Sequence, residues 1–240
     1  MANIRKDLPS LSIVIPAYNE ENNVEWLVRD IIKDSPKYGI NNYEIVVVDD
    51  GSTDATGKIA DGLAKEHKTI RVIHKKNGGY CSAMLDGIKE AKKDYIAYFP
   101  ADGQTLIKDI TKCIPYLGRV DLIMGDRGRR LDYTPYRLFI SYVYLILLRI
   151  LFNNKHRDIN WFHIWKREKI QNMEIISKGI FILAEIVIRF KNKKYLIVEA
   201  SVPYRSRRSG EAKNAKFSIA WQTFTDLLKF WFLLRLGKVR

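Results

Sequence analysis

Short apolar runs alternate with amphipathic segments along the first half of the chain. The runs have the length and the continuous apolar character of buried strands, and they cover residues 11–16, 43–49, 70–74, 95–99 and 121–125. The segments between them carry apolar residues at helical spacing and predict helices over 21–33, 55–66, 81–91 and 106–117. Continuous apolar strands that alternate with amphipathic helices are typical of a mostly parallel sheet with helices on both faces. The pattern therefore predicts an α/β fold.

A polar motif follows each of the first four predicted strands. The motifs are PAYNE at 16–20, DDGS at 49–52, KKNGG at 75–79 and PADGQ at 100–104. The carboxyl ends of parallel strands lie at one edge of a sheet, and ligands of open α/β sheets bind there. We therefore expect the four motifs to meet at one crevice.

Asp49 and Asp50 end the most apolar of these strands. Their carboxylates could accept hydrogen bonds from a base or from ribose hydroxyls, or they could face a metal. The alternative is a turn, since Asp-Gly-Ser-Thr-Asp also suits a turn that leads into a helix. We assign the turn and capping role to Asp54, and a ligand-binding role to Asp49 and Asp50 because of their place at the strand end.

Asp102 and Gln104 are the candidate metal ligands of the fourth motif. Carboxylate and amide oxygens bind Mg²⁺ or Mn²⁺, and Mg²⁺ needs only one or two carboxylates when phosphate oxygens and water complete its shell. Such an ion would offset the charge that grows on a diphosphate leaving group. A metal site at Asp102 and Gln104 is therefore expected.

Several common sites are missing from the sequence. No G-x-G-x-x-G follows the first strand, and G-x-x-x-x-G-K-[ST] and H-E-x-x-H do not occur, which argues against dinucleotide oxidoreductases, P-loop NTPases and zinc proteases. The four histidines are scattered, and we interpret them as structural: His67, His74, His156 and His163. Two cysteines, Cys81 and Cys113, indicate core positions and a reducing compartment. The first ten residues have no apolar stretch, so no secretory signal is expected.

The net charge of +14 is carried by the second half of the chain. Residues 1–118 have 16 of the 41 Lys and Arg and 17 of the 27 Asp and Glu, which leaves 25 basic against 10 acidic residues for 119–240. Such a basic half suits nucleic acid, an anionic membrane surface or a phosphorylated substrate. Composition does not choose among the three.

Two strongly apolar segments, 135–152 and 217–236, contain charged residues. A charge at the centre of a bilayer costs about 2.5–3.5 kcal/mol on insertion scales, so we expect neither segment to span a membrane. We predict instead amphipathic helices that lie in the membrane interface, over 135–152 and 216–240. The alternative is two ordinary core helices. In the second segment a polar stripe is formed by Ser218, Gln222, Thr225, Asp226 and Lys229.

Together the motifs resemble a known family. SIVIPAYNEENNV, EIVVVDDGSTDATGKIA, NGGYCSAMLDGIKEA and YIAYFPADGQ, in this order over about residues 10–126, are similar to the GT-A nucleotide-sugar domain of family 2 glycosyltransferases. The second half is similar to polyprenyl-phosphate (dolichol-phosphate) mannose and glucose synthases, at 125–127, 157–160, 180–189, 202–204 and 207–213. The Q-x-x-R-W element of processive synthases is missing, which argues against chain extension.

The resemblance implies a role for each matching residue. Pro16, Tyr18, Glu20, Asp49 and Asp50 would line the pocket of a GDP- or UDP-sugar, with Asp102 and Gln104 holding Mg²⁺ or Mn²⁺ on the diphosphate. Asp102, Arg127 and Arg157 would be the catalytic set, in which the two arginines bind the acceptor phosphate. The phosphates of the donor would be covered by Arg207, Arg208 and Lys213. Pro100 stands where the family often has the first Asp of D-x-D, so the metal rests on Asp102 and Gln104.

The resemblance also implies an organisation and a reaction. Residues 1–126 would bind the donor, 127–215 would bind the acceptor in the same GT-A domain, and 216–240 would lie on the cytoplasmic face of a membrane. The enzyme would move one hexose to a polyprenyl or dolichyl phosphate with inversion. The alternatives are transfer to a soluble or glycan hydroxyl, and a basic binding module without activity. We expect no nucleic-acid partner.

A phosphate acceptor is already largely anionic at neutral pH, so it needs cations that position it rather than a general base. Asp158 could be a base, although a structural or Arg-pairing role suits it better. Glu185 lies in an apolar segment and is either a paired buried acid or part of the site; we favour the structural interpretation.

Overall fold

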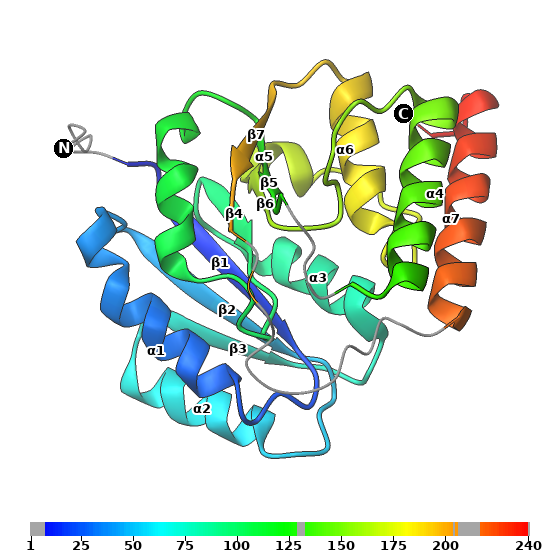
Figure 1. Cartoon of the computed structure of the whole chain (residues 1–240). Helices are drawn as coiled ribbons and strands as arrows, with labels where there is room; N and C mark the ends of the chain where they lie inside the picture. The colour runs from blue at the N-terminus through cyan, green and yellow to red at the C-terminus, as the bar shows by residue number, and fades with distance from the viewer. Residues whose placement is uncertain (1–7, 129–132, 204, 206–216, 240) are drawn as a thin grey trace.

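The computed structural model describes residues 8–128, 133–203, 205 and 217–239 (Figure 1). Within them a seven-stranded sheet has the order β3-β2-β1-β4-β6-β5-β7. The strands are β1 (Leu11–Ala17), β2 (Tyr43–Asp49), β3 (Ile70–His74), β4 (Tyr95–Tyr98), β5 (Leu122–Asp126), β6 (His163–Lys166) and β7 (Ile197–Ser201). The predicted α/β fold is confirmed.

The first four strands form a parallel unit. β1 pairs with β2 and β4, and β2 pairs with β3, all in parallel. The register places Asp49 beside both Ala17 and His74, so the ends of three neighbouring strands lie side by side. β1, β2 and β4 are buried on both faces, which explains their continuous apolar character, whereas the edge strand β3 is only partly buried.

The second half completes the sheet with a change of direction. β6 is inserted between β4 and β5 and runs antiparallel to both, while β7 pairs with β5 in parallel. Strand β5 corresponds to the predicted run 121–125, whereas β6 and β7 were not predicted. β6 has only four residues, HIWK, and its two polar ends conceal the apolar pattern.

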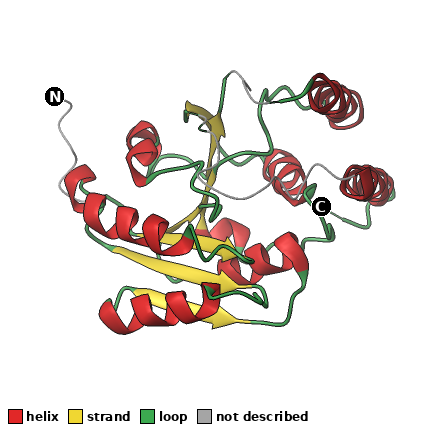
Figure 2. Cartoon of the chain, turned by 60° about the horizontal axis from the view of Figure 1, so that its bottom comes forward, coloured by secondary structure: helices red, strands yellow, loops and turns green. Residues whose placement is uncertain are grey.

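Helices cover both faces of the sheet (Figures 1 and 2). One apolar core lies between the sheet and α1 (Val24–Asp34) and α2 (Thr56–Glu66). A second core lies on the other face, under α3 (Gly79–Glu90) and α6 (Ile182–Asn192). The helices α4 (Pro135–Phe152) and α7 (Phe217–Arg235) pack on the outside of this second core, and a short α5 (Arg167–Ile170) follows β6.

The prediction of one continuous helix over 106–117 is wrong. Two short 3₁₀ helices, η2 (Ile107–Lys112) and η3 (Ile114–Tyr116), occupy this segment, and a third, η1 (Pro36–Tyr38), follows α1. Pro115 lacks the N–H that an α-helix would need at that position, so a continuous helix cannot pass through it. The Asp109 carboxylate accepts a hydrogen bond from Leu106 N at 2.9 Å and holds the start of η2.

Helices α4 and α7 lie side by side and leave much of their apolar surface exposed (Figure 1). α4 buries only Leu148 and Phe152, and α7 buries Leu227 and Phe230. Of the described helices, α4 alone is long and apolar enough to cross a membrane, which is a statement about length and composition only. Asp226 of the polar stripe faces the loop before α6. Its Oδ2 accepts hydrogen bonds from Lys178 N and Gly179 N, both at 3.1 Å.

Candidate active site

The loops after β1 and β2 are joined by hydrogen bonds, as expected for motifs at one edge of a sheet. Asn19 N donates to Ser52 Oγ at 3.0 Å, and Thr53 N donates to Asn19 Oδ1 at 2.8 Å. Asn19 has a φ of 52°, a left-handed conformation that Asn tolerates better than most residues. The first two motifs therefore lie against each other at this edge of the sheet.

Three predicted nucleotide-binding residues lie at the end of β1 and in the loop that follows it. Tyr18 is exposed, Pro16 is half-buried, and Glu20 Oε2 accepts a hydrogen bond from Asn23 Nδ2 at 2.7 Å. Glu20 N donates to Thr56 Oγ1 at 2.8 Å, which ties the loop to the start of α2. Asp54 Oδ1 accepts from Thr56 N at 2.9 Å, which is the expected turn, whereas the N-cap of α2 is Ala55 and the predicted capping role of Asp54 is not confirmed.

Asp49 is buried and engaged through both carboxylate oxygens. Oδ1 accepts a hydrogen bond from Ser52 N at 3.0 Å, and Oδ2 lies 3.0 Å from His74 Nδ1. An imidazole at this distance favours the hydrogen-bonding interpretation of Asp49 over the metal-facing one. The β2–β3 register brings the His74 ring to Asp49, and the interpretation of His74 as structural rather than catalytic stays a prediction.

Asp50 connects the second motif to the third. Its Oδ1 accepts from Gly78 N at 2.9 Å and its Oδ2 accepts from Gly79 N at 2.8 Å, at the start of α3. Lys75 Nζ lies 3.4 Å from Oδ1. A carboxylate at the N-terminus of a helix is stabilised by the helix dipole. Asp50 therefore fixes the KKNGG loop against the crevice.

Asp102 and Gln104 are brought together behind β4. Both are buried, and Gln104 N donates to Asp102 Oδ1 at 3.1 Å. Gln104 Nε2 donates to the backbone oxygen of Arg205 at 3.0 Å, so Oε1 is the amide atom that could ligate a cation. One carboxylate and one amide oxygen form a hard donor set that fits Mg²⁺ or Mn²⁺ when phosphate oxygens and water complete it. The described residues hold no group of three or more His, Cys, Asp and Glu suited to a metal.

Arg205 was not predicted as part of this region. Its guanidinium pairs with the buried carboxylate of Asp109, with Nη2 2.9 Å from Oδ1. This pair and the Gln104 contact hold residue 205 beside Asp102. Arg207, Arg208 and Lys213 follow shortly after in the sequence and lie outside the described residues. No sequence signal singled out Arg205 because its partner lies 96 positions away.

Arg127 is held by Asp158 at the end of β5. Arg127 Nε lies 2.6 Å from Oδ2 and Nη2 lies 2.6 Å from Oδ1, and Nη1 donates to Tyr133 Oη at 3.1 Å. The guanidinium also stacks over the ring of Trp161 at 4.9 Å. Burial lowers the pKa of Arg127, but the hydrogen bonds and charge of Asp158 outweigh it and the pKa is raised. The expected Arg-pairing role of Asp158 is thus the one that the structure shows.

Arg157 precedes Asp158 and is exposed. Arg157 is thus an exposed cation next in sequence to the buried Arg127–Asp158 pair. The interpretation of Glu185 as a paired buried acid is confirmed, because Arg189 Nε donates to its Oε1 at 2.8 Å and Ser177 N donates to its Oε2 at 2.9 Å.

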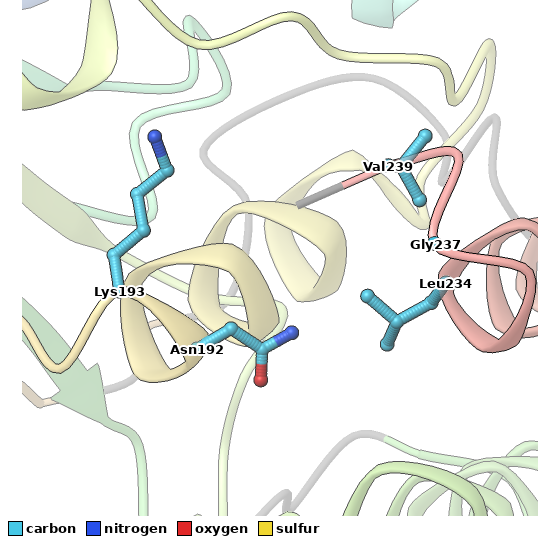
Figure 3. Close-up of a pocket in the computed structure, with 5 residues that line it drawn as sticks. All are labelled: Asn192, Lys193, Leu234, Gly237 and Val239. Atoms are coloured by element: carbon cyan, nitrogen blue, oxygen red, sulfur yellow. The ribbon is translucent and has the colours of Figure 1, made fainter.

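A separate pocket lies between the ends of α6 and α7, lined by Asn192, Lys193, Leu234, Gly237 and Val239 (Figure 3). It contains none of the predicted site residues. Since α6 leads into the start of β7, this pocket lies at the amino end of that strand, away from the edge that carries the motifs.

Residues 12–192 match the model of Glycosyl transferase family 2, which is three quarters of the chain. The chain belongs to this family. It is therefore a family 2 glycosyltransferase, as the motifs at the edge of the sheet suggest.

Relatives of this glycosyltransferase include lipid-phosphate sugar synthases. The chain is 34% identical over 212 residues to the dolichol-phosphate mannosyltransferase of Pyrococcus furiosus, covering 85% of the chain and 58% of that protein. It is 29% identical to the dodecaprenyl-phosphate galacturonate synthase of Rhizobium johnstonii, over 94% of the chain and 67% of the relative. It is 27% identical to the dolichol-phosphate mannosyltransferase of Saccharomyces cerevisiae, over 84% and 80%. The glycosyltransferase thus spans little more than half of the archaeal relative.

Solved structures support the fold. The glucosyl-3-phosphoglycerate synthase of Mycobacterium tuberculosis, in complex with Mn²⁺, UDP and its product, matches with a TM-score of 0.72 at 18% identity, covering 93% of this chain and 80% of that one. At this identity the likeness concerns the fold, which is of the GT-A kind.

Proposed function

We propose that this glycosyltransferase moves a single hexose from GDP-mannose or a UDP-sugar to a polyprenyl or dolichyl phosphate, with inversion at the sugar. The observation that carries the proposal is the state of Asp158. This acid is the candidate base on the acceptor side, yet both of its carboxylate oxygens accept hydrogen bonds from Arg127. With both oxygens held by Arg127, neither is turned toward an incoming hydroxyl, so an acceptor that arrives already ionised fits the site better than a hydroxyl.

The donor half supplies binding and orientation. Pro16 at the end of β1 with Tyr18 and Glu20 of the loop after it, and Asp49 and Asp50 at the end of β2, would surround the nucleoside. Asp102 and Gln104 would hold Mg²⁺ or Mn²⁺, which supplies charge stabilisation for the departing diphosphate. The residues from 207 to 213 would add cations over the same phosphates.

The acceptor half supplies cations. Arg157 would pair with the acceptor phosphate, since a guanidinium binds two phosphate oxygens at once. Arg127, fixed by Asp158, would place a second positive charge beside it. A phosphate oxygen would then attack C1 of the sugar from the face opposite the nucleoside diphosphate; the bond from C1 to the diphosphate breaks, and no proton has to move.

The lipid acceptor calls for contact with a membrane, which we place at α4 and α7. The exposed apolar residues of α4 recur at helical spacing, and they include Tyr136, Phe139, Val143, Ile146 and Ile150. Those of α7 do the same: Trp221, Phe224, Leu228 and Phe232. Such a stripe with flanking Lys and Arg suits the interface of an anionic leaflet, here the cytoplasmic face.

The buried residues of α7 determine how this contact should be tested. Leu227 and Phe230 are fully buried, and Asp226 holds the loop at 178–179. Removal of the segment after residue 215 would therefore damage the second core as well as the exposed stripe. Substitutions within the exposed stripe test membrane contact without that damage.

A panel of GDP- and UDP-sugars, each incubated with a short polyprenyl phosphate and Mg²⁺, tests the proposed function. Mass spectrometry of the lipid fraction should show one hexose added through the phosphate with one of the donors. Transfer to none of the donors, or addition of several sugars in a row, would contradict it.

A further inference from the structure

His74 lies between two carboxylates at the edge of the crevice. Its Nδ1 is 3.0 Å from Oδ2 of Asp49, and its Nε2 is 3.0 Å from Oδ1 of Asp61. The three residues come from three elements, because β2 ends at Asp49, β3 ends at His74 and Asp61 lies in α2. Asp49 and His74 are also direct partners in the sheet, so the backbone register fixes their contact.

A glycine leaves the space that the contact between Asp49 and His74 occupies. Gly57 of α2 packs against it, and a Cβ at that position would lie 2.5 Å from Oδ2 of Asp49 and 3.2 Å from Cε1 of His74. A larger residue would collide with the pair. The other oxygen of Asp49 accepts a hydrogen bond from Ser52 N at 3.0 Å. The carboxylate of Asp49 is thus held at both oxygens, and His74 provides one of the two anchors.

The geometry favours a protonated ring. A neutral imidazole has one N–H and one lone pair, whereas both nitrogens of His74 face carboxylate oxygens, which accept hydrogen bonds when ionised. Both hydrogen bonds are made when both nitrogens carry a proton. Hydrogen bonds to Asp61 and Asp49, together with their charges, raise the pKa of His74 above its ordinary value, and partial burial opposes them less strongly.

The ring can exchange its proton with the solvent. Its side chain is 50% exposed, whereas that of Asp49 is 9% exposed. Asp49 from β2 and Asp61 from α2 are the charged groups that face it from the elements packed against it. Lys75, the next residue along the chain, contacts Asp50 and Asp86 instead, at 3.4 and 3.1 Å.

We propose that protonated His74 is a positioning residue of the donor site, which holds the Asp49 carboxylate in place for the nucleoside and lets donor affinity fall when the ring loses its proton. The inference rests on the proposed function, because it takes Asp49 as a donor-binding residue. The direction in which donor affinity changes with pH follows from the geometry. At low pH both hydrogen bonds are made; as the pH rises through the raised pKa, one nitrogen turns a lone pair toward a carboxylate and the anchoring of Asp49 weakens.

Isothermal titration calorimetry of GDP and UDP with Mg²⁺, from pH 6 to 9, tests this role. The wild type is compared with His74→Gln, whose amide can donate one hydrogen bond but does not titrate, and with His67→Gln as a matched control. His67 is near the same helix, at the end of α2, and its Nε2 is 3.9 Å from Glu66 alone. The nucleotide's own titration is common to all three proteins and cancels in the comparison.

We expect the wild type and His67→Gln to lose roughly three- to tenfold in affinity toward high pH relative to His74→Gln, the size of one partly exposed charge-assisted hydrogen bond. Asp61→Asn should move the midpoint of this loss to lower pH, because one of the two carboxylates that raise the pKa of His74 is gone. Parallel curves for the wild type and His74→Gln would overturn the positioning role and leave the proposed function intact. If neither nucleotide binds the wild type at any pH, the proposed function fails, and this inference with it.

Discussion

The guanidinium of Arg127 and the carboxylate of Asp158 meet edge to edge, with two nitrogen–oxygen distances of 2.6 Å. Their side chains are 7% and 3% exposed. A buried pair of this kind adds little net stability, because the free-energy cost of desolvating the two charges offsets most of their electrostatic attraction. The pair instead fixes the position of the Arg127 guanidinium just after β5. The exposed Arg157 is the residue before Asp158 in the sequence.

Removal of one partner should therefore be costly. Asp158→Ala leaves the Arg127 charge buried without its counter-ion, and we expect the free energy of unfolding to fall by about 3–5 kcal/mol. Urea unfolding measures this loss. The double variant with Arg127→Ala should lose much less than the sum of the two single losses, since the two side chains are coupled. Additive losses of unfolding free energy would show that the two side chains are not coupled.

Arg157 should behave differently from Arg127. Because its side chain is exposed, Arg157→Ala should leave the unfolding free energy nearly unchanged while raising the KM for the lipid phosphate about tenfold, the worth of one charge-assisted contact. The KM for the nucleotide-sugar should not move. Lys155→Ala, which removes an exposed cation two residues earlier, is the matched control. An equal rise of both KM values would contradict the acceptor role of Arg157.

Asp102 should control the response to metal. Asp102→Asn keeps the size of the side chain but removes its charge, and we expect kcat to fall at least about a hundredfold, with the optimum moved to much higher Mg²⁺ or Mn²⁺ concentration. Turnover at several metal concentrations measures both effects. Asp34→Asn, at the end of α1 and paired with Lys37, should have no effect on either. Near-normal turnover at low metal would contradict the assignment of Asp102.

Membrane contact should depend on the exposed stripe of α7. Trp221→Glu and Phe232→Glu put a charge at positions that are 58% exposed, so folding should be preserved. Co-sedimentation with vesicles that contain anionic lipid should fall about tenfold or more for each, because an apolar contact is replaced by a charge of the same sign as the lipid. Thr225→Glu, exposed on the same helix, controls for charge alone. Equal loss for Thr225→Glu would show that net charge, not the apolar stripe, determines binding.

The parallel strands could be predicted from sequence because each is a short continuous apolar run between turn residues. β2 and β3 have the predicted bounds, and the motifs that follow them meet as expected. β6 was missed for the opposite reason: it has four residues, and its place depends on pairing with β4 and β5, which lie far away in the chain. The segment at 106–117 has helical spacing, but Pro115 prevents a continuous α-helix.

The sequence names the residues of the candidate site, and their roles stay predictions; it does not reveal the contacts between them. A motif shows that Asp49 ends a strand; only the register of β2 and β3 shows that His74 lies beside it. In the same way, Asp158 and Arg127 are 31 positions apart, and nothing in their local sequence reveals that they pair. Residue identities predict which groups reach the crevice, whereas the partners that orient those groups depend on long-range packing.

The most direct test of the proposed reaction compares a short polyprenyl phosphate with the matching polyprenol as acceptor, at saturating nucleotide-sugar and Mg²⁺. The account predicts steady transfer to the phosphate and none above background to the alcohol, because the paired Asp158 does not act as a base for a hydroxyl. Transfer to the alcohol at a comparable rate would contradict it.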